Sequence, residues 1–372
     1  MSDITLSAGI RQNLLSLQNT TNDLNTTQEQ LSTGKKVNTA FDNPTSYFTS
    51  QSLTNRANDL SALLDQVGQA QQTLNAANDG LTGLTSLLEQ ALSTAQQAQQ
   101  ASNDTAGSTT GTVNLTGNTL GANNLLITTG GTTYTVAIAA SATVAAIEAD
   151  INGTAGLGST GAVTATDDGS GHLVLTANSP STSFTVSGAE QAAFGLTASA
   201  VNGTSTTRTT LQTNYNSLLT QIDQLAGDSS YNGVNLLNGN NLTVNFNENG
   251  TSSLTINGVN FNHAGLGLSV IAAGGFQTGA TITAAETAIN TAISTVRAQT
   301  ETFGTNSSTI STRQTFETNL INTLQTGASN LVLADQNQAS ANLLTEQTQQ
   351  QLEISALSIA NQANQSVLKL FG

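Results

Sequence analysis

The sequence predicts an α+β protein in which long helices from both ends form an antiparallel coiled-coil bundle, with β-structure between them. Three observations predict this fold. Near both ends, apolar residues recur at alternating steps of four and three, the spacing of a coiled-coil seam. Residues 105–205 are instead rich in Gly, Thr and Ser and carry short alternating runs typical of strands. Helical periodicity then returns and continues to the end of the chain.

The N-terminal seam predicts two helices with a loop between them. In the first helix, polar Thr21 and Gln28 occupy seam positions, which weakens the pairing but helps to fix its register. The second helix carries the same rhythm from Leu53 to Leu88. Between them, Gly34 and an Asn-Pro pair at 43–44 interrupt the pattern. The apolar seam residues of the first helix are Ile10, Leu14, Leu17, Leu24 and Leu31.

The region 105–205 is predicted to be a small β-rich domain with one short helix. Its strand-like runs include "NLLITTGGTTYTVAI", "GHLVLTA" and "SFTVSG", and the segment "SATVAAIEADING" is the helical exception. The sequence Asp167-Asp168-Gly169 lies between two runs. Because it lacks the alternating carboxylates and terminal Glu of a calcium-binding EF-hand loop, we predict a turn there.

Beyond this region the chain alternates between helix and hairpin. A helical segment containing Leu211, Tyr215 and Leu225 precedes "NLTVNFNENGTSSLTINGVNF", which predicts a β-hairpin with Asn249 and Gly250 in its turn. From about residue 282 the chain is predicted to be helical to its end. The seam of its last part consists of Leu352, Ala356, Ile359, Ala363, Val367 and Leu370.

The two helical ends need partners. Ordering a terminal helix costs backbone entropy at every residue, and a single amphipathic helix buries only part of its apolar stripe in return. The N-terminal helix of the same chain is the obvious partner for the C-terminal one, but two stripes still leave apolar side chains uncovered. We therefore expect self-assembly through both ends, with subunit interfaces at the N-terminal seam and at Leu352, Ile359, Val367 and Leu370.

Composition excludes several other classes of protein. The net charge of −15 comes from 23 acidic residues, scattered singly, against only 8 Lys and Arg. Nucleic-acid binding needs clustered basic residues, so it is not expected. The absence of Cys excludes disulfides and thiolate metal sites. The sequence shows neither the pattern of an ordinary signal peptide nor an apolar run long enough to span a membrane.

No catalytic, metal-binding or cofactor-binding site is expected. The run Gly34-Lys35-Lys36 lacks the second Gly and the Ser or Thr of a phosphate-binding loop. The two histidines, His172 and His263, lack the His-Glu-x-x-His spacing of a metalloprotease. We therefore interpret Gly34-Lys35-Lys36 as part of a loop between two helices, and the two histidines as ordinary structural residues.

At both ends the sequence resembles bacterial flagellin, the subunit of the flagellar filament. The N-terminal resemblance lies in "NLLSLQNTTNDLNTTQEQLSTGKKVNTAFDNP" and continues in "LNAANDGLTGL". "QIDQLAGDSSYNGVNLL" resembles the family's segment before its β-hairpin, and "QQQLEISALSIANQANQSVLKLF" resembles its C-terminal helix. These segments follow one another in the family's order. Since both ends match at once, the resemblance is more specific than either end alone.

The resemblance implies a division into the family's inner (D0-like) and outer (D1-like) helical domains. The D0-like helices would be 1–40 and 336–372. The D1-like parts would be 41–104 and 206–335, with 105–205 inserted as an outer domain. The loop residues Lys35, Lys36 and Asp42 match the family signature, and the resemblance implies that they make subunit contacts.

The resemblance also implies partners and a location. The chain would be exported through the flagellar type III apparatus, with a chaperone on its C-terminal segment. It would join other copies in an extracellular filament for swimming motility, beside hook-associated and cap proteins, without a cofactor. Two alternatives stay open: a hook–filament junction protein, and a secreted adhesin or enzyme displayed by 105–205.

Overall fold

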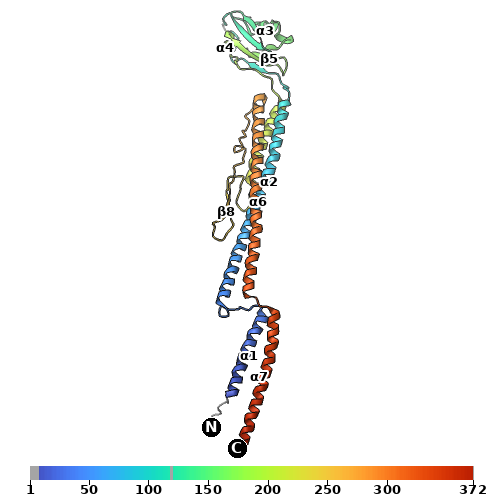
Figure 1. The fold of residues 1–372 in the computed structure, drawn as a ribbon. Coiled ribbons are helices and arrows are strands. Elements are labelled where there is room, and N and C mark those ends of the chain that lie inside the picture. Colours follow the sequence, from blue (N-terminus) through green and yellow to red (C-terminus); the bar gives the residue numbers. More distant parts are fainter. Residues whose placement is uncertain (1–7, 118–119, 372) are drawn as a thin grey trace. The chain divides into compact units, whose positions relative to one another are not determined.

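The computed structural model describes residues 8–117 and 120–371, which divide into two compact units. Unit 1 is drawn from 1–72, 243–256 and 306–372, and unit 2 from 73–242 and 257–305. Two long helices, α2 (Pro44–Gln100) and α6 (Gly279–Val332), each contribute one part to each unit (Figure 1). The α+β fold class, with helical ends and small antiparallel sheets between them, is confirmed.

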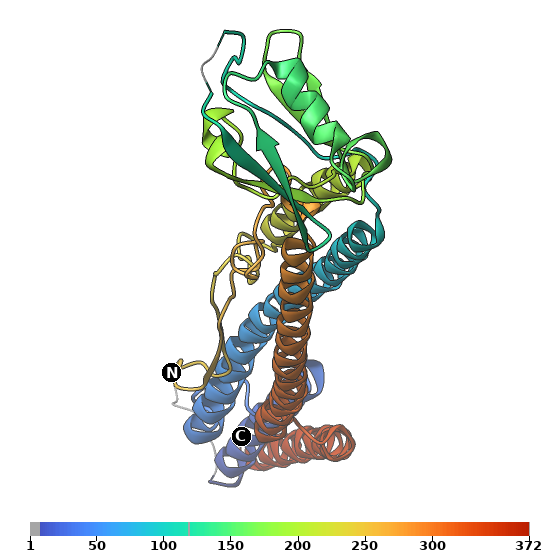
Figure 2. The same cartoon turned by 90° about the horizontal axis from the view of Figure 1, so that it is seen from above.

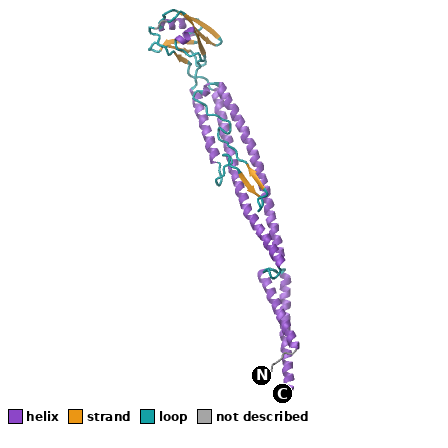
Figure 3. Cartoon of the chain, turned by 90° about the vertical axis from the view of Figure 1, so that its left-hand side faces the viewer, coloured by secondary structure: helices purple, strands orange, loops and turns teal. Residues whose placement is uncertain are grey.

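Unit 1 contains two pairs of helices. Helix α1 (Ala8–Thr33) lies beside α7 (Gln336–Phe371), as Figures 1 and 3 both show. The first part of α2 packs against the last part of α6. The Ser50 hydroxyl donates to the carbonyl of Ala328 at 2.9 Å, and the Gln71 amide donates to the Ser307 hydroxyl at 2.7 Å. The two segments are therefore antiparallel. Their apolar core consists of Ala57, Leu60, Leu63, Ile321 and Leu324.

A β-hairpin of strands β7 (Leu242–Asn245) and β8 (Ser253–Ile256) completes unit 1 (Figure 3). Its turn is closed by the amide of Gly250, which donates to the carbonyl of Asn247 at 3.2 Å. Gly250 has a φ of 66°, a conformation that glycine adopts without strain, and Asn249 precedes it in the same turn.

Two side chains tie the hairpin to the helices. The guanidinium of Arg56 on α2 donates to a carboxylate oxygen of Glu248 at 2.8 Å. The guanidinium of Arg313 on α6 lies 5.3 Å from the ring centroid of Phe246, within cation–π range. The ion pair joins partly exposed side chains, whereas in the ring contact an exposed Arg313 covers the buried ring of Phe246.

Unit 2 includes a β-rich domain with two three-stranded antiparallel sheets. One has the strand order β1 (Ser108–Thr110), β5 (Leu173–Ala177), β4 (Val163–Asp167). The other has the order β3 (Thr132–Ile138), β2 (Asn123–Thr129), β6 (Phe184–Gly188). Helix α3 (Val144–Gly153) packs against β3 and β4 (Figure 2).

This domain holds more helix than the one short segment predicted for 105–205. A five-residue helix, α4 (Ala189–Ala193), follows β6, and a 3-10 turn, η1 (Gly158–Thr160), precedes β4. Both are shorter than two turns, so they leave no periodicity in the sequence. The buried faces of the strands and of α3 share one core, which includes Leu125, Ile127, Val136, Ile147, Leu175 and Phe184.

The rest of unit 2 packs around α5 (Thr206–Asp228), which begins at the capping residue Ser205. A 3-10 turn, η2 (Gly275–Gln277), lies against it, and the rings of Tyr215 and Phe276 are 5.4 Å apart between centroids. Burial in this contact raises the pKa of the Tyr215 hydroxyl to about 12.

Asn235 closes the C-terminal end of α5. It is 5% exposed, and its amide donates to the carbonyls of Ala226 and Gly227, both at 2.8 Å. Its side-chain oxygen accepts from the amide of Leu237 at 2.9 Å. These bonds pair two carbonyls at the helix end and the amide of Leu237, which would otherwise be unsatisfied.

We predict that Asn235→Ala destabilises unit 2 by roughly 2–4 kcal/mol, because it leaves buried carbonyls and an amide without partners. Thermal unfolding followed by circular dichroism measures the effect, and faster amide exchange at Leu237 locates it. The exposed Asn238, three residues away, provides the control, since Asn238→Ala is expected to change stability by no more than about 0.5 kcal/mol. Equal melting curves for both variants would contradict the assigned role.

Candidate assembly interface

Helices α1 and α7 run antiparallel and are joined by side-chain hydrogen bonds. One oxygen of Glu353 accepts from the hydroxyls of Ser16 at 2.8 Å and Thr20 at 3.1 Å. One oxygen of Glu346 accepts from the hydroxyl of Thr27 at 3.1 Å. The partner's residue number falls along α7 as the residue number rises along α1, so the two helices run in opposite directions.

The contact between these helices has heptad spacing and mixes apolar with polar side chains. The less exposed positions of α7, at alternating steps of four and three, are Ala339, Leu343, Glu346, Gln350, Glu353, Leu357 and Ala360. On α1 they are Ile10, Asn13, Leu17, Thr20, Leu24, Thr27 and Leu31. We call this contact the α1–α7 seam. Polar groups at such positions fix register at a cost in stability.

The predicted apolar stripe of α7 lies on another face. Ile359 follows Glu353 by six residues, which at about 100° per residue places the two side chains about 120° apart around the helix. Leu352 is 65% exposed and Ile359 is 66% exposed, and Leu344, about 80° around the helix from Leu352, is also exposed. We call Leu344, Leu352 and Ile359 the outer face of α7. Exposed apolar side chains on one face of a helix favour contact with a partner, and which partner covers this face stays a prediction.

The predicted seam residues of α1 divide between seam and solvent. Ile10 and Leu24 are buried against the rest of unit 1, and Leu17 and Leu31 are half-buried. Leu14 is exposed. On α7, Val367 and Leu370 belong to the helix, but their side chains lie outside the described part of the structure. The contacts of these residues with other subunits stay a prediction.

Two glutamates, Glu346 and Glu353, place carboxylates in the α1–α7 seam. The second carboxylate oxygens of Glu346 and Glu353 are buried without a hydrogen-bond partner among the described residues. The hydrogen bond from Ser16 is the largest cause that lowers the pKa of the Glu353 carboxyl. Sequence reasoning on apolar residues missed this pairing. A signal was present, because Glu346 and Glu353 are seven residues apart, as are their partners Thr20 and Thr27.

The loop at 34–43, which we call the α1–α2 loop, is fixed to the junction of α6 and α7. The amide of Lys36 donates to the carbonyl of Val332 at 2.7 Å, and the carbonyl of Gly34 accepts from the amide of Ala334 at 3.0 Å. Lys35 forms a bridge with Leu333. The predicted contact residues Lys35 and Lys36 are therefore held through their backbones, which leaves their side chains exposed.

Asp42, the third predicted contact residue of the loop, forms hydrogen bonds with the backbone of the loop itself. One of its carboxylate oxygens accepts from the amides of Asn38 and Thr39, both at 2.8 Å. These backbone bonds, that from Thr39 first, hold the pKa of the Asp42 carboxyl below its ordinary value of 3.8. Its neighbour Phe41 is 98% exposed. Sequence reasoning did not single out Phe41, although an aromatic residue in a polar loop is a usable signal.

We predict that Asp42→Ala loosens the α1–α2 loop. Because the folded pKa is lowered, the ionised carboxylate contributes stability above the unfolded pKa of about 3.8, and this is lost as pH falls through the folded value. Exchange of the Asn38 and Thr39 amides should therefore speed up in the variant at pH 7. Asp42→Asn keeps an acceptor oxygen and should have a smaller effect. Unchanged exchange in Asp42→Ala would contradict the capping role.

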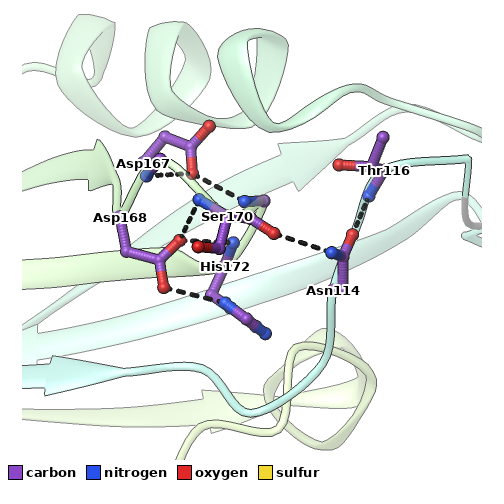
Figure 4. A network of polar contacts seen from close by, with 8 residues as sticks. Asn114, Thr116, Asp167, Asp168, Ser170 and His172 are labelled. Carbon is purple, nitrogen blue, oxygen red and sulfur yellow. Dashed lines mark hydrogen bonds and ion pairs between the residues drawn. The ribbon is translucent and has the colours of Figure 1, made fainter.

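Elsewhere, acidic side chains and histidines are engaged in local structure. In the turn between β4 and β5, the carboxylate of Asp167 accepts from the amides of Gly169 and Gly171 (Figure 4). The carboxylate of Asp168 accepts from the amide of Ser170 and lies 2.8 Å from the Nδ1 atom of His172.

The second histidine has a similar arrangement, since the Nδ1 atom of His263 lies 2.7 Å from a carboxylate oxygen of Asp223 on α5. Within 8–117 and 120–371, no three metal-ligating side chains gather. Among the helices described, none is long and apolar enough to cross a membrane.

Two helical ends that pair with each other, around a β-rich insertion, define a helical structural protein. Comparison with known proteins supports this class. Residues 8–130 match the bacterial flagellin N-terminal helical region, and residues 286–371 match the bacterial flagellin C-terminal helical region. The two matches together span more than half of the chain. The chain belongs to the bacterial flagellin family, whose members are structural proteins and not enzymes.

Individual relatives agree with the family. Flagellin FljK and flagellin FljM of Caulobacter vibrioides (strain ATCC 19089 / CIP 103742 / CB 15) are each 29% identical to the chain over 162 residues. These alignments cover 43% of the chain and 59% of each relative, so the chain spans about three-fifths of the length of the curated relatives that it matches.

Proposed function

We propose that the chain is a subunit of the bacterial flagellar filament and polymerises through its helical ends. The observation that carries this proposal is the outer face of α7. Its apolar residues Leu344, Leu352 and Ile359 are exposed although α7 already has a partner in α1. Burying an exposed Leu or Ile side chain stabilises a contact by roughly 1.5–3 kcal/mol, so several such residues on one helix favour association with further copies.

The difference in side chains between the seam and the outer face of α7 supports the same proposal. The α1–α7 seam places hydroxyls and carboxylates among its apolar residues, and these polar groups specify one register within a chain. The outer face offers exposed apolar side chains that the seam does not bury, and this suits contacts between copies. In this arrangement each chain first pairs its own ends and then buries the outer face against its neighbours.

Membership of the flagellin family suggests where each part of the chain would lie in such a filament. The D0-like helices 1–40 and 336–372 would form the inner part of the filament, and 41–104 with 206–335 the surrounding D1-like part. Residues 105–205 would face outward. Export through the type III apparatus, a chaperone on the C-terminal segment, contacts with hook-associated and cap proteins, and a role in swimming motility belong to the same proposal, as does an extracellular location.

Electron microscopy of the purified chain, with and without filament fragments as seeds, tests the proposal. Long tubes are the expected result. Short rings that do not elongate would indicate a hook–filament junction protein instead. Protein that stays monomeric with seeds and at high concentration would contradict assembly and favour an adhesin or enzyme displayed by 105–205.

A further inference from the structure

The α1–α2 loop presents an unusual combination of side chains for this chain. Phe41 is 98% exposed, so its ring lies on nothing in its own molecule. Lys35 and Lys36 are two of only 8 Lys and Arg residues in a chain that has 23 Asp and Glu residues. Among the described residues neither lysine forms an ion pair, whereas Arg56 is paired with Glu248. The loop thus presents one exposed aromatic ring and two lysine side chains that form no ion pair among the described residues.

A groove with the opposite properties lies elsewhere in unit 1. It runs along α2 to the tip of the β7–β8 hairpin, and we call it the hairpin groove. Its lining includes the ring of Phe48, which is 62% exposed, and the carboxylates of Asp59 and Glu248 with the guanidinium of Arg56. One apolar ring and a net negative lining match an aromatic anchor that is flanked by lysines.

The loop does not fill the groove of its own chain. Phe41 is 98% exposed, so its ring does not pack on Phe48 of the same molecule. Asp59 lies fifteen residues into α2 from Pro44, or about 22 Å at 1.5 Å per residue. Phe41 precedes Pro44 by three residues, and so few residues reach about 10 Å at most. The amide of Lys36 also fixes the other end of the loop to Val332. Within its own chain the loop therefore leaves Phe48 uncovered and cannot reach Asp59, whereas the loop of a second copy can meet both.

We propose that the α1–α2 loop of one subunit docks in the hairpin groove of the next, with Phe41 against Phe48 and Lys35 and Lys36 facing Asp59 and Glu248. This inference rests on the proposed function and names the contact that joins successive copies. Loop and groove are different surfaces of the same unit. A contact of this kind is heterologous, and when its rotation does not close it generates an open helical filament.

Cysteine cross-linking tests the docking directly, because the chain has no Cys of its own. Ala40→Cys places a thiol beside Phe41, and Asn55→Cys places one in the groove. The two variants are purified separately, mixed, assembled and oxidised. We expect a disulfide between the two kinds of chain in assembled samples only. Gln66→Cys is the matched control, exposed on the same face of α2 but about 16 Å beyond Asn55, and should not cross-link.

Several outcomes separate this inference from the proposed function. If the unmodified chain does not assemble, the proposed function fails. If it assembles and the Ala40–Asn55 disulfide is absent, or no more frequent than with Gln66, the docking fails alone. Cross-linked material that stays a closed dimer would also overturn the inference, because the contact would then not propagate.

Assembly measurements provide a second test that needs no cross-link. Phe41→Ala is expected to raise the critical concentration for polymerisation about 10- to 100-fold, because it removes one buried ring per contact. The ring is exposed in the subunit, so the variant should keep the circular dichroism spectrum and melting curve of the parent. A critical concentration within about twofold of the parent would overturn the role of Phe41.

Charge reversal separates attraction from simple loss of packing. Lys36→Glu should weaken assembly, and adding Asp59→Lys to the same chain should restore it, because the charges across the contact then match again. Arg297→Glu makes the same change of net charge in unit 2 and should assemble like the parent. Failure of Asp59→Lys to restore assembly, or equal loss in Arg297→Glu, would overturn the assigned partners.

Discussion

Ile359→Asp is expected to abolish filaments. Ile359 is 66% exposed on the outer face of α7, and the proposed assembly buries it against neighbouring copies. Burial of an unpaired carboxylate is costly by several kcal/mol, and the lost apolar contact adds roughly 1.5–3 kcal/mol. Since every subunit makes the same contact, the effect repeats along the polymer. Seeded electron microscopy and sedimentation measure the loss.

The subunit itself should be unaffected by this change. Ile359 is not a position of the α1–α7 seam, so the pairing through Glu353 and Glu346 remains, as does the β-rich domain of 105–205. Asn361→Asp introduces the same charge at an exposed position that lies about 100° or more around the helix from Leu344, Leu352 and Ile359, and should assemble far better. Filaments of normal length from Ile359→Asp would contradict the role given to the outer face.

Glu317→Leu is expected to stabilise the subunit by roughly 1–3 kcal/mol at pH 7. Glu317 lies on α6 and is 1% exposed, and neither carboxylate oxygen has a hydrogen-bond partner among the described residues. One turn further along the helix, Ile321 belongs to the apolar core of unit 1. An ionisable group at such a position weakens the packing that surrounds it.

The pH dependence of this effect has a definite sign. Burial raises the pKa of the Glu317 carboxyl above its ordinary value of 4.5, while the nearby Arg313 lowers it to a smaller extent. The folded state therefore holds the proton more tightly than the unfolded state. Stability from protonation is fully present below about pH 4.5 and is lost as pH rises through the raised folded pKa. The gain from Glu317→Leu should be larger at pH 7 than at pH 4.

Thermal unfolding of dilute monomer at the two pH values checks this prediction. Glu301→Leu is the control, since Glu301 is an exposed acidic residue on the same helix and its loss should change stability by no more than about 0.5 kcal/mol. A Glu317→Leu variant that is less stable than the parent, or equally affected at pH 4 and pH 7, would contradict the account of this residue.

Much of the fold is predictable from the sequence because it depends on local periodicity. The steps of four and three in the two end regions predict helices, and the structure has α1, α2, α6 and α7 there. The asparagine and glycine at 249–250 predict a hairpin between alternating runs, where β7 and β8 lie. The short helix α4 could not be predicted, since five residues are too few for a helical repeat.

The sequence by itself determined that α7 is an amphipathic helix with an apolar stripe and that both ends of the chain need partners. Only the tertiary structure decided that Glu346 and Glu353 face α1 while Leu352 and Ile359 face outward. The physical reason is that periodicity gives the angle between side chains around one helix, whereas the face that meets a partner depends on which groups the partner presents. Here α1 presents the hydroxyls of Ser16, Thr20 and Thr27, which select carboxylates.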